Sequence, residues 1–186
     1  LLVNLWIPLQ QVTEPLVLAD GRSLDRRRHQ LRYGLPTGSF LDRDEDQVIN
    51  DIWHLLHDDA QQWYFRSDMD HRSALVFNTL STPHGAGVLP GEDVAERCSL
   101  ALEAAEPAAA SGDVDGLLDA VRSAGDTELS VPTTPALRDA IAAMVAVLDE
   151  AAADPAGVCG ARAVQWTAAS QAARRAVVRM SLEMRM

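Results

Sequence analysis

The sequence contains no lysine, and positive charge is scarce: all 16 basic residues are arginine, against 27 acidic residues, which leaves a net charge of -11. Such a balance argues against a nucleic-acid-binding surface, which needs a basic face. No run of about eighteen apolar residues is present, and nothing at the N-terminus has the order of a signal peptide. The sequence therefore predicts neither a membrane span nor a secretory leader.

Cysteine is also rare, with only Cys98 and Cys159 in the 186 residues. Two cysteines are too few for a disulfide framework or a cysteine-rich zinc site, and they suit a reducing cytoplasm. Hydrophobic residues make up 47% and charged residues 23% of the chain, which is typical of a globular domain with a real core. We therefore expect a single cytoplasmic domain over residues 1–186.

The first half of the chain reads mainly as strands. Residues 1–9 are apolar and β-rich, and residues 16–18 and 73–80 form further short strand patterns. The chain opens inside the first of these without a methionine, from which we expect that an upstream segment is missing. Residues 22–39 read as a polar loop. Residues 44–62 predict a helix, because acidic residues crowd its first turn and apolar residues recur at helical spacing.

The second half changes character and predicts a helical insert over residues 91–170. Gly91-Glu92-Asp93 opens its first helix, the Ser-Gly-Asp sequence at 111–113 breaks it, and Thr134-Pro135 starts a later one, because proline suits the first helical turn. Exposed apolar faces on these helices would be compatible with a homodimer.

The clearest strand pattern lies at the end of the chain. Over residues 176–185 apolar and polar side chains alternate with period two, so that residues 171–186 predict a strand that returns to the sheet. Strands thus bracket a helical segment, which indicates an α+β fold with a β-core over residues 1–90, one helix within it, and the insert before the last strand.

Few residues are candidates for chemistry, and His84 is the first of them. It follows a predicted strand in the loop Pro-His-Gly-Ala-Gly, where small neighbours let a ligand approach closely. Imidazole is a common ligand of iron and zinc. The alternative is a loop histidine satisfied by hydrogen bonds, and the residue alone leaves both interpretations open.

Arg179 and Ser181 are the second candidate, because alternate residues of a strand share a face. A guanidinium and a hydroxyl on one face can bind a carboxylate together. The alternative is a solvated edge strand. The runner-up pair with the same spacing, Arg97 and Ser99, lies in a predicted helix, where the two side chains diverge.

Three weaker patterns carry a simpler explanation. His57 and Asp59 have the spacing of a metal-binding His-x-Asp pair, but on a helix residues two apart point about 200° away from each other. Cys98 lies on an apolar helix face, where packing is the expected role. The arginines at 26–28 are most simply a solvated patch, with anion binding as the alternative.

Taken in order, three segments resemble iron(II)/2-oxoglutarate-dependent oxygenases, in particular natural-product hydroxylases and desaturases. "VNLWIPLQQVTEPLVLAD" is similar to the strand pair that follows the His-x-Asp motif in this superfamily. "WYFRSDMDHRSALVFNTLSTPHGAG" resembles the strand with the distal iron-binding histidine, and "RRAVVRMSLEMRM" resembles the strand with an Arg-x-Ser pair. The resemblance covers residues 1–20, 60–88 and 172–186.

The resemblance implies a double-stranded β-helix, the jelly-roll or cupin-like core, and the cofactors Fe(II) and 2-oxoglutarate. His84 would be the distal iron ligand, Arg179 and Ser181 would hold the far carboxylate of 2-oxoglutarate, and Asn4 and Trp6 would line the substrate pocket. The partners would be dioxygen and a small molecule whose identity, like the choice between hydroxylation and desaturation, the sequence leaves open. The helical insert would form a lid.

Two departures from the family pattern are plain in the sequence. Helices fill the segment between the histidine and the arginine, where family members keep a short gap. No His-x-Asp stands on a suitable strand, so that the chain supplies one of three metal ligands and the others are expected upstream of Leu1. The competing classes are a non-catalytic jelly-roll binding domain and a helical protein-interaction module.

Overall fold

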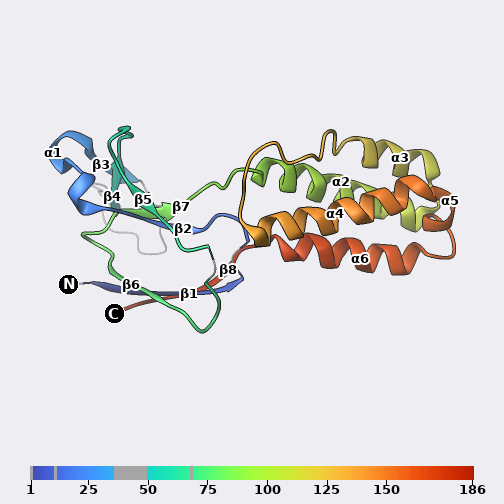
Figure 1. Ribbon diagram of the computed structural model, residues 1–186. Helices are drawn as coiled ribbons and strands as arrows, with labels where there is room; N and C mark the ends of the chain where they lie inside the picture. Colours follow the sequence, from blue (N-terminus) through green and yellow to red (C-terminus); the bar gives the residue numbers. More distant parts are fainter. Residues whose placement is uncertain (1, 11, 36–49, 68) are drawn as a thin grey trace, which may run out of the picture.

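The computed structural model describes residues 2–10, 12–35, 50–67 and 69–186, and within these ranges the fold is α+β. Short antiparallel strands from both ends of the chain form one part of the molecule, and five helices form a bundle beside it (Figure 1). The chain passes from the strands into the bundle after β7 and returns to them in β8. The bundle is therefore an insertion between two strands of the β part.

The first sheet joins the beginning and the end of the chain. Its central strand β1 (Val3–Gln10) pairs antiparallel with β6 (Leu75–Asn78) on one side and with β8 (Met180–Arg185) on the other. Along β1 the residues Asn4, Trp6 and Pro8 alternate with more exposed neighbours and are buried. This alternation gives the sheet one inward face, as strand geometry requires.

A second sheet has the order β5-β2-β7, in which β2 (Leu16–Ala19) is central, between β5 (Trp63–Tyr64) and β7 (His84–Ala86). The two sheets share an apolar interior, to which the first contributes Trp6 and Phe77 and the second contributes Leu16; Met69 completes it. These four residues are called the interior cluster below. The cluster holds the inward faces of both sheets together.

The expected helix over residues 44–62 is wrong for the part that the structure describes. Asn50–Leu55 is a strand, β4, which pairs antiparallel with β3 (Gln30–Leu35). Residues 44–49 lie outside the described ranges. Six successive cross-strand pairs join this segment to β3, so that non-local pairing overrides the local helix signal.

The polar stretch expected as a loop over residues 22–39 is also more ordered than predicted. A 3-10 turn, η1 (Gly21–Ser23), leads into the one-turn helix α1 (Arg26–His29), which is followed directly by β3. Asp25 caps α1, because its carboxylate accepts a hydrogen bond from the backbone N–H of Arg27. The expected loop over 36–39 lies outside the described residues.

The insert consists of α2 (Glu92–Ser111), α3 (Val114–Arg122), α4 (Pro135–Ala153), α5 (Pro155–Val158) and α6 (Ala163–Ala176). Its helix ends follow the sequence signals. Asp113, Thr134 and Asp154 each cap a helix through the side chain, and Gly112 ends α2 with a left-handed φ of 79°. No helix in the described part of the chain combines the length and the apolar character needed to cross a membrane.

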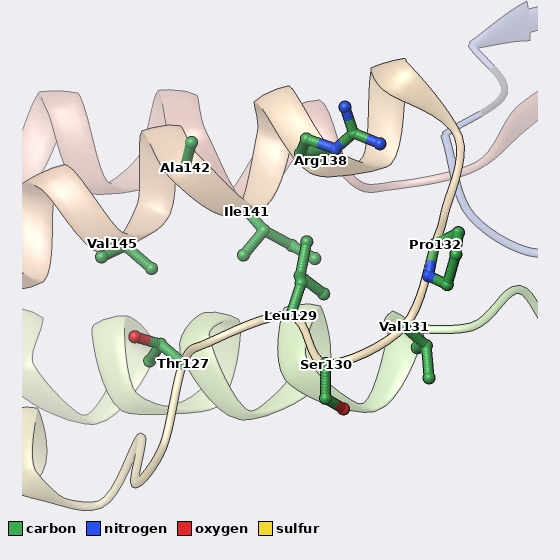
Figure 2. Close-up of a pocket in the computed structure, with 9 residues that line it drawn as sticks. All are labelled: Thr127, Leu129, Ser130, Val131, Pro132, Arg138, Ile141, Ala142 and Val145. Atoms are coloured by element: carbon green, nitrogen blue, oxygen red, sulfur yellow. The ribbon is translucent and has the colours of Figure 1, made fainter.

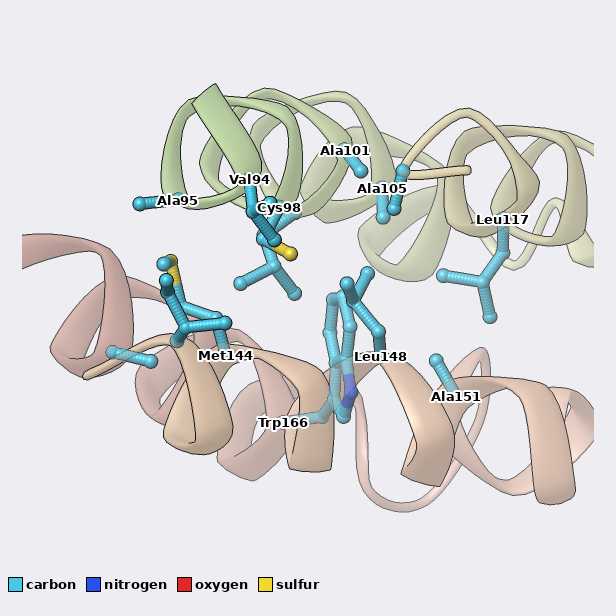
Figure 3. Close-up of a cluster of buried hydrophobic side chains, with 14 of the residues drawn as sticks. Val94, Ala95, Cys98, Ala101, Ala105, Leu117, Met144, Leu148, Ala151 and Trp166 are labelled. Atoms are coloured by element: carbon cyan, nitrogen blue, oxygen red, sulfur yellow. The ribbon is translucent and has the colours of Figure 1, made fainter. Parts of the chain in front are cut away.

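The bundle has its own core, distinct from the interior cluster. Leu102, Leu117, Leu137 and Met144 are fully buried in it, and Trp166 fills its centre (Figure 3). The Trp166 indole N–H donates a hydrogen bond of 3.0 Å to the Val147 carbonyl, which satisfies its one polar group. Cys98 lies in the same core, and burial raises the pKa of its thiol, so packing is its role.

The returning strand starts later than the expected residue 171. Helix α6 continues to Ala176, and β8 begins at Met180. The junction is tied to the β part, because the Thr13 hydroxyl donates to the Val177 carbonyl at 2.6 Å and the Gln10 amide donates to the Ala176 carbonyl at 2.8 Å. Helix propensity in the alanine-rich segment extends the helix until these contacts redirect the chain.

The end of β2 offers a test by titration. Two hydrogen bonds from Arg22, first from its guanidinium and then from its backbone N–H, lower the pKa of Asp20 from 3.8 to about 2. We expect the Asp20 carboxyl signal to titrate in NMR with a midpoint near this value, and Arg22→Gln to move the midpoint part of the way back. The stabilisation is present above the ordinary pKa and is lost as the pH falls through the lowered one. A wild-type midpoint near 3.8 would contradict the ion pair.

Candidate functional site

His84 is the first residue of β7, where it pairs with Leu18 of the central strand. Its ring lies against Phe77 of the interior cluster, with 4.8 Å between ring centroids. The Nδ1 atom lies 2.8 Å from the Thr82 carbonyl oxygen. Because a carbonyl only accepts hydrogen bonds, Nδ1 is the protonated nitrogen in the neutral tautomer, and Nε2 then has the lone pair that a metal ligand or a general base requires.

Arg179 lies immediately before β8, and its side chain also reaches the interior cluster. Its guanidinium carbon is 5.7 Å from the centre of the Trp6 ring, a cation–π distance. Ser181 stands opposite Pro8 in the register of β1 and β8, so that it belongs to the inward face as well, although it is exposed. The structure thus brings the predicted histidine and arginine to one cluster, through Phe77 and Trp6.

Asn4 and Trp6 both lie on the inward face of β1, with 1% and 2% of their surface exposed. Trp6 packs in the interior cluster and supports Arg179. Asn4 donates a hydrogen bond of 2.7 Å from its side-chain amide to Glu183, whereas its amide oxygen is buried without a partner. Both lie in the strand expected over residues 1–9, but neither is among the residues that line the cavity beside His84, and their contact with a substrate stays a prediction.

Glu183 and Arg185 are the residues that sequence reasoning missed. In β8 they follow Ser181 at period two, and in the register they stand opposite Trp6 and Asn4 on the inward face. The Arg185 guanidinium donates to the Glu183 carboxylate at 2.9 Å. The same alternation that singled out Arg179 and Ser181 continues through both residues, so the signal was present in the sequence.

The charge state of Glu183 follows from these contacts. Burial raises its pKa, but the hydrogen bonds from Asn4 and Arg185 outweigh this, and the positive charge of Arg185 adds to them, so that the pKa lies below its ordinary value. The carboxylate is therefore ionised at neutral pH. It holds Asn4 and Arg185 in place and lies within electrostatic reach of His84.

A cavity of about 380 Å³ opens beside His84. Its walls come from α1, from the strands β4 and β5 and from the segment that leads into β7, and they include Arg26, Trp53, His54, Trp63, Leu80 and His84. This volume lies within the range of about 300–1,000 Å³ that is usual for small-molecule sites. All of its lining residues precede residue 85, and the helical insert supplies none of them, so the proposed lid stays a prediction.

A larger hollow, of about 620 Å³, lies on the bundle between the segment that precedes α4 and the first turns of α4 itself. Figure 2 shows the apolar side chains of Leu129, Ile141 and Val145 lining it, and Arg138 is the one charged residue among those that line it. The described residues that line this hollow include no histidine, cysteine or carboxylate that could bind a metal or transfer a proton. The smaller cavity at His84 is therefore the candidate functional site, because chemistry-bearing side chains converge there.

The weaker candidates do not assemble into sites. His57 and Asp59 lie 3.7 Å apart but are highly exposed, and the helix on which they were expected is absent, because residues 56–58 are irregular. Asp58 instead lies 3.3 Å from the buried His29. Within the described ranges, no group of three histidine, cysteine or acidic side chains is placed to hold a metal ion.

The alternative Arg-x-Ser pair, Arg97 and Ser99, lies in helix α2, as expected. Arg97 in α2 forms an ion pair of 2.8 Å with Asp93 and donates to the carbonyls of Ala124 and Asp126, which turns it toward the α3–α4 connection.

Comparison with protein-family models, curated proteins and solved structures finds no match for the chain. The chemistry of the site is therefore judged from its own residues.

Proposed function

We propose that the chain is part of an iron(II)/2-oxoglutarate-dependent oxygenase with a double-stranded β-helix core, acting on a small natural-product-like molecule by hydroxylation or desaturation. One observation carries the proposal: His84 and Arg179, distant in sequence, each contact the interior cluster between two antiparallel sheets. The family motif requires this convergence of an iron ligand and a 2-oxoglutarate anchor. Two facing antiparallel sheets joined by crossovers are consistent with a jelly-roll.

The state of His84 fits the role of an iron ligand. The hydrogen bond from Nδ1 to the Thr82 carbonyl orients the ring and leaves Nε2 for the metal, which is the usual arrangement around a ligating histidine. The remaining ligands would come from outside the described residues. Iron(II) bound by two histidines and a carboxylate would supply open positions for 2-oxoglutarate and dioxygen.

The positive charge on the inward face suits a dicarboxylic co-substrate. Arg179 would bind the far carboxylate of 2-oxoglutarate in a fork, and the Ser181 hydroxyl would donate a further hydrogen bond. Trp6 beneath the guanidinium fixes its position and excludes water from one side. Arg185 is already paired with the ionised Glu183, so the positive charge for the co-substrate would come from Arg179.

The test is an anaerobic titration of the complete polypeptide with Fe(II) in the presence of 2-oxoglutarate. We expect a visible charge-transfer band, its loss in His84→Ala, and a weakened 2-oxoglutarate dependence in Arg179→Gln. The matched control is His71→Ala, since His71 is exposed and lies outside the site.

A complete polypeptide that binds iron without a band, or a band that survives His84→Ala, would contradict the assignment. Absence of both iron binding and 2-oxoglutarate decarboxylation would favour the non-catalytic jelly-roll or the helical interaction module. Circular dichroism of each variant separates loss of the ligand from loss of the fold.

A further inference from the structure

We propose that the cavity beside His84 binds a ring-containing small molecule that carries a carboxylate, with its apolar part against Trp53 and Trp63 and its charge toward Arg26. The binding is a property of this chain by itself. Its interpretation as substrate binding rests on the proposed function.

The apolar half of the argument comes from side chains that are unusually exposed for their type. Trp53, Trp63 and Leu80 line the cavity with 58%, 39% and 67% of their surface exposed. Three large apolar side chains around one concave opening make a contiguous apolar surface rather than scattered exposure. Indole faces bind planar rings well, because stacking adds to the burial of apolar area.

The charges of the residues that line the cavity indicate a negatively charged ligand. The whole chain carries a net charge of -11, yet none of the described residues that line this cavity is acidic, and Arg26 is among them together with His54 and His84. A cavity in an acidic protein whose described walls carry a guanidinium and no carboxylate favours an anionic ligand. The guanidinium also matches a carboxylate in shape.

The position of Arg26 is set by the fold. Arg26 is the first residue of α1, and its guanidinium is hydrogen-bonded to the Ser81 carbonyl in the segment that leads to His84. This contact joins α1 to the segment before β7 and uses one of the five guanidinium donors, so that the others can bind a ligand. Arg27 and Arg28 next to it are exposed but do not line the cavity.

The size of the cavity limits the ligand to a small molecule. A volume of about 380 Å³ lies toward the lower end of the usual range for ligand sites. One or two rings with a short acidic side chain fill such a space, and a folded protein segment does not.

The test measures binding of two matched probes, cinnamate and its neutral analogue cinnamamide, to the whole polypeptide without iron or 2-oxoglutarate, by calorimetry and saturation-transfer NMR. We expect cinnamate to bind about tenfold more tightly than cinnamamide, because only the carboxylate of cinnamate forms a charge-assisted hydrogen bond with Arg26. Arg26→Gln should abolish the difference, and Arg26→Lys should restore part of it. The control Arg27→Gln should leave it unchanged.

The aromatic contact is tested separately. Trp63→Ala should weaken both probes by a similar factor, whereas Tyr64→Ala, on the same strand but outside the cavity lining, should weaken neither. Trp63→Phe serves where the alanine variant does not fold. Equal binding of the two probes, no binding of either at millimolar concentration, or equal effects of Arg26→Gln and Arg27→Gln would overturn the proposal. None of these outcomes depends on iron, so the oxygenase proposal stands or falls by its own titration.

Discussion

Replacing Trp166 with alanine should lower the free energy of unfolding of the helical bundle by about 3–5 kcal/mol, the usual cost of deleting a buried tryptophan side chain. Trp166 is 1% exposed and lies at the centre of the bundle core (Figure 3). The substitution leaves a large cavity and also removes the hydrogen bond that joins α6 to the Val147 carbonyl of α4. Urea denaturation followed by far-ultraviolet circular dichroism measures the loss.

The matched control lies on the same helix. Val164 is 86% exposed, so Val164→Ala removes almost no buried surface, and we expect a change within about 0.5 kcal/mol. A loss of similar size in both variants would show that helix propensity, rather than packing around the indole, determines the stability of α6.

Replacing Trp6 with alanine should have a comparably large effect on the β part. Trp6 is 2% exposed and is one of only four residues in the interior cluster, so about 3–5 kcal/mol is expected here too. Arg179 loses the ring over which it lies, which frees the guanidinium from its inward position. Hydrogen–deuterium exchange of peptides from β1, β6 and β8 should rise sharply, because these strands pack through the same cluster.

The control for this second variant is Val76→Ala on β6, since the Val76 side chain is 64% exposed on the sheet. Exchange in peptides from α2 and α4 should stay unchanged in Trp6→Ala, because the interior cluster and the bundle core share no buried residue. Faster exchange throughout the bundle would contradict this independence and indicate one cooperative unit.

The helical insert was predictable because its signals are local. Thr134 before Pro135, Asp113 before α3 and Gly112 after α2 each act on the backbone within a few residues, through a side-chain cap or a left-handed φ. The apolar faces of α2 and α4 were likewise correct, since an amphipathic helix is defined by its own spacing.

The strands were less predictable because each depends on a partner elsewhere. Residues 50–55 carry acidic and apolar residues at helical spacing, yet pairing with β3 makes them a strand. The alternation in the last strand identified Arg179 and Ser181 as candidates. Glu183 and Arg185 continue this alternation, but their place beside Trp6 and Asn4 follows only from the pairing of β8 with β1.

The sequence alone determined where α2 begins and ends and where α4 begins, that apolar and polar residues alternate in the last strand, and that His84 and Arg179 are its most chemically suggestive residues. Only the tertiary structure decided that these two side chains meet at one cluster, that residues 50–55 pair as a strand, and that tryptophans from β4 and β5 share a cavity with Arg26 and His84. The physical reason is the range of the forces involved: capping and helical periodicity act within a few residues, whereas strand pairing and the convergence of a site depend on which distant segments share a buried face.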